Sequence, residues 1–267
     1  MPISHIEDVN DPRLEVFRLN ERQLFPRDQR RDPTESGLFV AEGDLVVERA
    51  FAAGCKPRAL LCAERYAMQL GDVEVDVFIG DIELRREVTG LGVPLDALGI
   101  FERPQPMHLP TLLNNSRRVV ALEAVDNPTN IGAVVRSAAG LGWDALALDW
   151  TSADPFARRA LRVAMGTSFL LPHGRATSDQ VLLDQLESAN LTTVAMTPDP
   201  QATDIRDLAA DDEFRSRRIA VLFGSERIGL SEQTLAKAHV RARIAMHHNV
   251  DSLNIANAAS IALFALS

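Results

Sequence analysis

The second half of the chain alternates short apolar runs with amphipathic stretches, and this alternation restricts the fold more than any other feature of the sequence. Apolar runs of strand length occupy residues 119–125, 145–148, 192–196, 219–223 and 241–246. Stretches with helical spacing of apolar residues occupy 128–141, 155–165, 179–189, a segment from about 231, and 252–266. Strands that alternate with helices predict a largely parallel sheet covered by helices on both faces. The fold class expected from this half is α/β.

The first half shows a shorter alternation of the same kind. Strand-like runs occupy 37–43, 58–62 and 75–79, and helix-like stretches occupy 44–53, 64–70 and 82–89. A proline-rich, aperiodic segment then runs from Arg103 to Ser116. Since domains commonly span roughly 100 to 200 residues, two domains are expected. We predict a smaller N-terminal α/β domain over residues 1–105, a linker over 106–116 and a second α/β domain over 117–267.

A polar segment follows the first strand of the second half. Asn127 and Pro128 predict a helix start, because asparagine caps free backbone amides and proline fits the first turn. The helix that follows is rich in glycine and alanine and carries Arg136. An arginine in a closely packed helix needs an anionic or carbonyl partner, so Arg136 is a candidate functional residue. The alternative is a surface arginine whose head group reaches solvent.

A glycine-bracketed turn follows the strand at 219–223. Glycines at the C-terminal end of a strand allow a ligand to approach the backbone, and open α/β sheets bind ligands at such ends. Glu226 lies in this turn and can hydrogen-bond a ligand or a neighbouring loop. The alternative is an ordinary turn, because Gly-x-Glu occurs in many turns. Ser225 lacks the G-x-S-x-G spacing of a nucleophile elbow.

A third polar segment, from Ile244 to Asn254, precedes the last helix. Asp251 or Ser252 can cap that helix, and the functional alternative for Ser252 is a hydroxyl directed at a substrate. Asn254 is an unfavourable residue inside a helix, which favours a role for it. His247 and His248 are adjacent but have no third ligand, so they do not predict a metal site.

Taken together and in this order, the three segments resemble the three motifs of the SpoU (TrmH) family in the SPOUT methyltransferase superfamily, over about residues 118–267. The matching residues are Asn130, Gly132 and Arg136 in the first motif, Gly224, Glu226, Gly229 and Leu230 in the second, and Ser252, Leu253 and Asn254 in the third. The first half is similar, more loosely, to a small RNA-binding domain of ribosomal-protein type that many family members carry.

The resemblance implies a trefoil-knotted C-terminal domain and a homodimer whose two chains build each active site. It also implies transfer of a methyl group from S-adenosylmethionine to a ribose 2′-hydroxyl of RNA, and the two-domain layout favours rRNA over tRNA. The residues implied to be catalytic are Arg136, Asn130, Ser252, Glu226 and Asn254. The residues implied to bind the cofactor are Leu222, Phe223, Gly224, Ser225, Glu226, Ile244, Met246, Ser252, Leu253 and Asn254.

The chain departs from the family pattern near the third motif. Ala245 and His248 stand where the family usually has proline and glycine, and Ala256 and Asn257 stand where it has serine and a β-branched residue. We hypothesise that His248, beside the expected methyl donor, accepts a proton near neutral pH. The alternative function is a non-catalytic RNA-binding protein that retains the knotted fold.

The formal net charge of −9 argues against a nucleic-acid partner, because phosphate binding draws on clustered Lys and Arg. Local patches decide binding, however. Four arginines near the N-terminus are therefore candidates for RNA binding: Arg22, Arg27, Arg30 and Arg31. The alternative for this stretch is a solvated helical face.

Other functional classes are disfavoured by what the sequence lacks. No G-x-G-x-x-G follows the first strand of either half, which argues against a dinucleotide-dependent oxidoreductase. Cys55 and Cys62 are too few for a disulfide framework or a zinc site, so we expect both to be buried and expect no metal. No secretory signal and no apolar run of roughly 20 residues is present, which predicts a cytoplasmic protein.

Overall fold

The computed structural model describes residues 3–25, 37–71, 73–93, 95–178, 181–248 and 250–267. These residues form two compact units. Unit 1 comprises residues 1–105 and 156–169, and unit 2 comprises residues 106–155 and 170–267. Among the described residues, no helix is both long enough and apolar enough to cross a membrane.

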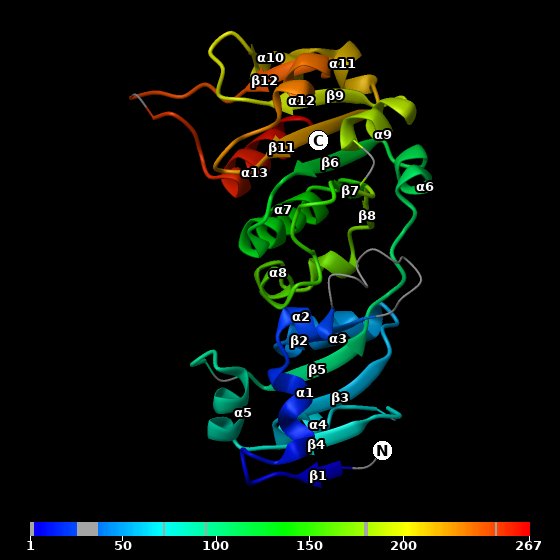
Figure 1. Ribbon diagram of the computed structural model, residues 1–267, viewed down its shortest axis with the longest axis vertical. Helices are drawn as coiled ribbons and strands as arrows, with labels where there is room; N and C mark the ends of the chain where they lie inside the picture. The colour runs from blue at the N-terminus through cyan, green and yellow to red at the C-terminus, as the bar shows by residue number, and fades with distance from the viewer. Residues whose placement is uncertain (1–2, 26–36, 72, 94, 179–180, 249) are drawn as a thin grey trace. The chain divides into compact units, whose positions relative to one another are not determined.

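Unit 1 is built on a five-stranded sheet of order β1-β4-β3-β5-β2 (Figure 1). The strands are β1 (Ile3–His5), β2 (Leu38–Glu42), β3 (Pro57–Cys62), β4 (Asp76–Ile79) and β5 (Ala97–Glu102). β5 runs antiparallel to both of its neighbours, while β1, β4 and β3 are parallel. The helices are η1 (Pro12–Leu14), α1 (Glu15–Arg18), α2 (Glu21–Leu24), α3 (Asp44–Ala52), α4 (Glu64–Ala67) and α5 (Ile82–Thr89). The sequence predicted β2, β3 and β4 with the helices α3, α4 and α5, but not β1 or β5.

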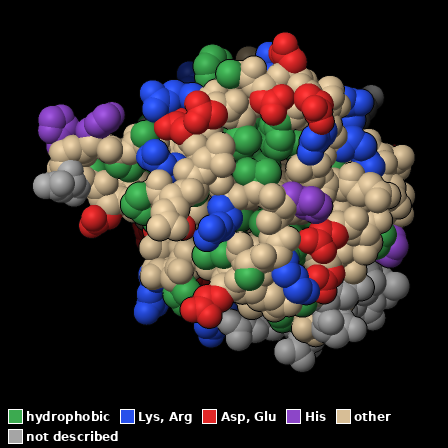
Figure 2. Space-filling model, turned by 90° about the horizontal axis from the view of Figure 1, so that it is seen from above, with side chains coloured by type: hydrophobic (Ala, Val, Ile, Leu, Met, Phe, Trp, Pro, Cys, Tyr) green, Lys and Arg blue, Asp and Glu red, His purple; other side chains and the backbone are tan. Residues whose placement is uncertain are grey.

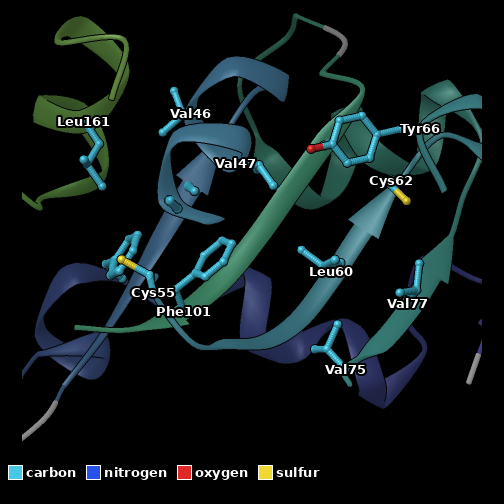
Figure 3. Close-up of a cluster of buried hydrophobic side chains, with 14 of the residues drawn as sticks. Val46, Val47, Cys55, Leu60, Cys62, Tyr66, Val75, Val77, Phe101 and Leu161 are labelled. Atoms are coloured by element: carbon cyan, nitrogen blue, oxygen red, sulfur yellow. The ribbon is translucent and has the colours of Figure 1, made fainter. Parts of the chain in front are cut away.

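One hydrophobic core of unit 1 lies between this sheet and α3 (Figure 3). Leu60 and Phe101 point into it from β3 and β5, and Val47 points into it from α3. Cys55 and Cys62 are 8% and 0% exposed, so the expected burial of both cysteines is confirmed. Burial raises the pKa of the Cys62 thiol to about 11 and also raises that of Cys55.

Residues 156–169 belong to this core, although the sequence analysis placed them in the second domain. The segment contains α8 (Arg158–Val163) and η3 (Thr167–Phe169). Phe156 and Phe169 lie against Phe39 of β2 with ring centroids 5.5 Å apart in each pair, and Leu161 is fully buried in the same cluster (Figure 3). The alternation of apolar residues in this stretch identified the helix but not the sheet on which it packs.

Unit 2 is built on a seven-stranded sheet of order β10-β12-β9-β11-β6-β7-β8, in which every adjacent pair is parallel (Figure 1). The strands are β6 (Arg118–Glu123), β7 (Ala145–Leu148), β8 (His173–Arg175), β9 (Thr192–Met196), β10 (Thr203–Asp204), β11 (Ile219–Gly224) and β12 (Val240–Arg243). The expected α/β fold with a mostly parallel sheet is confirmed. β6 and β11 are neighbours in register, so Glu123 lies opposite Gly224 where the two strands end.

The helices of unit 2 are α6 (Leu109–Asn114), α7 (Pro128–Gly140), α9 (Leu182–Ser188), α10 (Ile205–Ala210), α11 (Asp212–Ser216), α12 (Glu232–Lys237) and α13 (Ile255–Ala265). α6 lies within the segment predicted to be a linker. Pro110 lies in the first turn of this helix, whose Leu109, Leu112 and Leu113 are buried in the core of unit 2. α13 begins at Ile255 rather than at Ser252, because Asn254 is its N-cap.

Candidate functional site

The first motif forms the beginning of α7. Asn127 is the N-cap, and its side-chain oxygen accepts a hydrogen bond from Thr129 N–H at 3.0 Å, while Pro128 occupies the first turn. This confirms the helix start predicted from Asn127 and Pro128. The cap places Asn130 in the first turn of α7, where it is 5% exposed. The helix then carries Arg136 to its exposed side.

Hydrogen bonds join the three predicted motifs at one point. The Asn254 side-chain amide donates to the Asn130 side-chain oxygen at 3.4 Å and to the Glu226 carboxylate at 2.5 Å. The Asn254 side-chain oxygen in turn accepts from Ala256 N–H at 2.8 Å, which starts α13. One asparagine therefore caps a helix and holds two other motifs, which accounts for its position directly before α13. Neither Asp251 nor Ser252 is the cap, so the predicted capping by these residues is wrong.

α7 and α13 pack side by side behind this point (Figure 1). The Ser137 and Ser260 hydroxyls are 2.8 Å apart, and the Trp143 indole N–H donates to the Leu263 carbonyl at 3.1 Å. Ala138 of α7 and Ala259 of α13 are fully buried. Small side chains allow the two helices to approach closely, which fixes the distance between Asn130 and Asn254.

The second motif is a tight turn at the end of β11. A Cβ atom on Gly224 would lie 2.1 Å from the Gly229 carbonyl carbon and 2.2 Å from Leu230 N, so only glycine fits. Ser225 and Gly229 form a β-bridge, and Gly229 has a φ of +77°, which favours glycine. Glycines at this strand end were expected to allow a ligand to approach the backbone. The structure adds that the turn closes on itself there, leaving Glu226 exposed at its tip.

Glu123 fixes the same turn from the neighbouring strand, and the sequence analysis did not identify it. Its carboxylate accepts from Ser231 N–H at 2.7 Å and from the Thr234 hydroxyl at 2.6 Å. Ser231 is the N-cap of α12, and Thr234 is 1% exposed. Glu123 thus connects the end of β6 to the beginning of α12. The second motif begins at Gly224, which lies opposite Glu123 on β11, and ends just before α12.

The third motif follows an open segment after β12. Among the described residues of 244–253, one backbone-to-backbone hydrogen bond is present, from Val250 N–H to the His247 carbonyl at 3.2 Å. Ile244, Met246 and Leu253 are partly exposed. The segment extends from the body of unit 2 between β12 and α13 (Figure 1), and exposed histidine side chains stand on a narrow projection in the space-filling view (Figure 2).

His248 has a φ of +57°, in the left-handed region that glycine adopts without strain. A left-handed backbone at this position accounts for the glycine that the SpoU family usually has there. His248 is exposed, and Ser252 is exposed as well. Neither side chain has a hydrogen-bond partner among the described residues, so the structure does not bring Ser252 to the Asn130, Glu226 and Asn254 cluster.

Arg136 also lies apart from that cluster. It is exposed, and it has no hydrogen bond or ion pair with any residue in the described ranges. Arg136 lies six positions after Asn130 on α7. Because an α-helix has 3.6 residues per turn, their side chains point in directions about 120° apart around the helix axis. The anionic or carbonyl partner expected for Arg136 is therefore not supplied within the described part of this chain.

Of the arginines predicted to bind RNA, Arg22 lies on α2 with its side chain exposed. Arg27, Arg30 and Arg31 lie outside the described residues. No group of three or more His, Cys, Asp or Glu side chains suited to a metal ion occurs within the described ranges.

Three comparisons place these motifs in a known family. The model of the SpoU rRNA methylase family matches residues 117–264. A protein of Mycobacterium tuberculosis named as an uncharacterised tRNA/rRNA methyltransferase is 34% identical over 269 residues, covering 99% of this chain and 91% of the relative. The 23S rRNA (guanosine(2553)-2′-O)-methyltransferase of Bacillus subtilis is 24% identical, with coverage of 89% and 91%.

The solved structures agree with the sequence matches. An AdoMet-bound rRNA methyltransferase from Sinorhizobium meliloti superimposes with a TM-score of 0.80 at 26% identity, covering 99% of this chain and 97% of that one. Asn130, Glu226 and Asn254, one residue from each of the three motifs, meet through Asn254 in the present structure. The chain belongs to the SpoU rRNA methylase family.

Proposed function

We propose that this protein transfers a methyl group from S-adenosylmethionine to a ribose 2′-hydroxyl of RNA, with rRNA as the favoured substrate. The observation that carries the proposal is the hydrogen-bonded cluster of Asn130, Glu226 and Asn254, together with Arg136, which is exposed on the same helix as Asn130 and has no ion pair within the described ranges. The relatives named as RNA methyltransferases, and the one named as a 2′-O-methyltransferase, support the same assignment.

The open segment and the glycine turn fit S-adenosylmethionine, the ligand of the Sinorhizobium neighbour. Backbone N–H and C=O groups of 244–248 and 250–253 are largely unused by the described backbone, so they can bind the polar edge of an adenine ring. The partly exposed side chains of Ile244, Met246 and Leu253 offer apolar surface to its faces. When bound, the cofactor supplies an electrophilic methyl group on a sulfonium.

The side chains of this chain position the RNA and manage charge. A guanidinium stays protonated under ordinary conditions, so Arg136 does not act as a base. It holds the phosphate next to the target ribose and stabilises negative charge as it develops on the 2′-oxygen. Asn130 and Asn254 orient the ribose and the third motif, and Glu226 fixes the Asn254 amide. The proton leaves to water or to a phosphate oxygen.

The proposal includes a homodimer and a trefoil knot in the second domain. Arg136 points away from Asn130 on its helix, which favours a site completed by the Arg136 of a second copy. The exposed apolar residues of α13 beside it, Ile261 and Phe264, are 42% and 71% exposed and suit such a contact. We further propose that residues 1–105 act as the RNA-binding domain and that the protein works in the cytoplasm.

The test is methyl transfer by the wild-type protein and by Arg136→Ala, with Arg217→Ala as the control. Arg217 forms an exposed pair with Glu213 on α11 and has no contact with the cluster. Mass spectrometry of nucleosides from treated rRNA should show 2′-O-methylation by the wild type and the control. Removal of Arg136 should lower kcat about 10²- to 10³-fold, the effect of losing one donor to a developing oxyanion. Cofactor affinity, measured by calorimetry, should not change.

The dimer is tested by mixing two inactive variants. If Arg136 acts in the partner's site, mixed Arg136→Ala and Asn254→Ala proteins should regain activity, because a heterodimer contains one complete site. Activity that stays absent after mixing contradicts a shared site. A wild-type protein that binds RNA but neither binds S-adenosylmethionine nor transfers a methyl group supports the alternative of a non-catalytic RNA-binding protein.

A further inference from the structure

We infer that α8 supplies phosphate contacts to the RNA-binding surface of unit 1, and that Arg159 is its main phosphate ligand. The inference rests on the proposed RNA substrate and goes further, because α8 lies in the sequence between two strands of unit 2. Three of the six residues of α8 are arginines: Arg158, Arg159 and Arg162. Their contacts in unit 1 show that Arg158 and Arg162 anchor the helix, whereas Arg159 is available to a ligand.

Arg158 and Arg162 anchor the helix. The Glu42 carboxylate, whose side chain is fully buried, accepts from Arg158 Nε and from Arg162 Nη1, the latter at 2.5 Å. Arg158 Nη2 is buried as well, so this guanidinium cannot reach a ligand in solvent. The two guanidinium groups therefore share one buried carboxylate.

Arg159 has the opposite character. It is exposed, and it makes no hydrogen bond or ion pair within the described part of the chain. Its neighbours on either side in α8 are held by the Glu42 bond and by burial of Ala160, so the backbone that carries Arg159 is fixed. A guanidinium on a fixed backbone, with no internal partner, suits bidentate contact with a phosphate group.

Further arginines lie around the same end of α8. Glu21 accepts from Arg158 N–H at 2.6 Å, which brings α2, with its exposed Arg22, to the start of α8. The Arg103 guanidinium lies over the Phe156 ring, 5.3 Å from its centroid. Arginines of three separate segments therefore lie close to the start of α8. Such a cluster of guanidinium groups favours a polyanion locally, although the net charge of the chain is −9.

The test compares Arg159→Ala and Arg159→Glu with Arg86→Ala and Arg86→Glu. Arg86 is an arginine of the same unit that pairs with Glu83 on α5. α8 packs on β2, at one edge of the sheet. α5 follows β4, and two strands, β3 and β5, lie between β4 and β2. The Arg159 and Arg86 substitutions therefore change the charge of unit 1 by the same amount, but at two separate sites. The probe is a short fluorescein-labelled RNA hairpin, and its affinity is measured by anisotropy over a series of KCl concentrations.

Loss of one phosphate contact should lower the slope of log K against log[KCl] by about 0.7 to 0.9 for Arg159→Ala and weaken binding about tenfold. The Arg86 variants should match the wild type. S-adenosylmethionine affinity and thermal stability should be the same in all variants, because the exposed Arg159 side chain forms no hydrogen bond or ion pair with the described residues. Arg159 variants that bind the hairpin like the Arg86 variants overturn the inference, even if the wild type methylates RNA. A wild type that binds through Arg159 yet transfers no methyl group supports the inference and overturns the proposed activity instead.

Discussion

Gly224 shows how a single residue can be required by the backbone rather than by a ligand. Its missing Cβ leaves room for Gly229 and Leu230 at distances that no Cβ tolerates. Gly224→Ala should therefore force the turn open and lower the free energy of unfolding by about 1 to 3 kcal/mol, the usual cost of overpacking. Because Glu226 lies two residues further on, S-adenosylmethionine binding should weaken as well. Chemical denaturation and calorimetry measure the two effects.

Gly140 offers a matched control for this substitution. It ends α7, its φ is not positive, and a Cβ there would meet nothing within 4 Å. Gly140→Ala should raise the free energy of unfolding by about 0.5 to 1 kcal/mol, because alanine loses less backbone entropy on folding. A Gly224→Ala protein as stable as the Gly140→Ala protein would contradict the close approach at the turn.

At the scale of elements, Glu123 connects β6 to α12 and thereby holds the turn between them. Glu123→Ala would leave the buried Thr234 hydroxyl and the Ser231 amide without their acceptor, which costs about 1 to 3 kcal/mol. We expect the KM for S-adenosylmethionine to rise more than kcat falls, because we propose that this turn contributes to cofactor binding. Glu123→Gln, which retains one carbonyl acceptor, should recover most of the affinity.

The control for this prediction is Glu213→Ala. Glu213 forms an exposed pair with Arg217, and such pairs contribute about 0 to 1 kcal/mol. Its loss should alter neither KM nor kcat. Equal losses of kcat and affinity in Glu123→Ala, without recovery in Glu123→Gln, would mean that Glu123 acts through general stability and not through the position of the turn.

Elements could be predicted from the sequence where local chemistry determines them. Asn127 and Pro128 located the start of α7 because capping depends on neighbouring residues. The three motifs were assigned to one site, and one residue of each is hydrogen-bonded at Asn254, a contact that the sequence did not indicate. Glu123 was not found, because its partners lie 108 and 111 positions away along the chain. α6 was missed because the prolines at 104, 106 and 110 suggested a linker, whereas its three leucines are buried in unit 2.

At the scale of the whole molecule, the chain crosses between the two units at residues 105–106, 155–156 and 169–170. The segment 156–169 is joined to β7 and β8 of unit 2 but packs in unit 1, where Glu42 holds Arg158 and Arg162. Local sequence patterns could not reveal this arrangement, because the helix has the same apolar spacing whichever core it joins. The arrangement raises the question of whether the two units unfold together.

The chain carries separate probes for each unit. Both of its cysteines, Cys55 and Cys62, lie in unit 1, and both of its tryptophans, Trp143 and Trp150, lie in unit 2. Burial raises the pKa of Cys62 to about 11, so at pH 8 little thiolate is present in the folded unit. Unfolding returns the pKa toward about 8.5 and makes the thiol reactive. Since the unfolded chain loses this proton first, the free energy of unfolding of unit 1 should fall as the pH rises from 9 toward 11.

Glu42→Ala should separate the stabilities of the two units. Removing the carboxylate leaves two partly buried guanidinium groups without a partner, which costs about 3 to 5 kcal/mol in unit 1 and should expose both thiols to alkylation at lower denaturant. For unit 2, release of 156–169 only lengthens the connection between β7 and β8, and doubling a loop costs about 0.6 kcal/mol. The tryptophan transition should therefore shift little, and Glu48→Ala, at an exposed site on α3, should shift neither probe. Equal shifts of the thiol and tryptophan transitions in Glu42→Ala would instead mean that the segment couples both units into one cooperative structure.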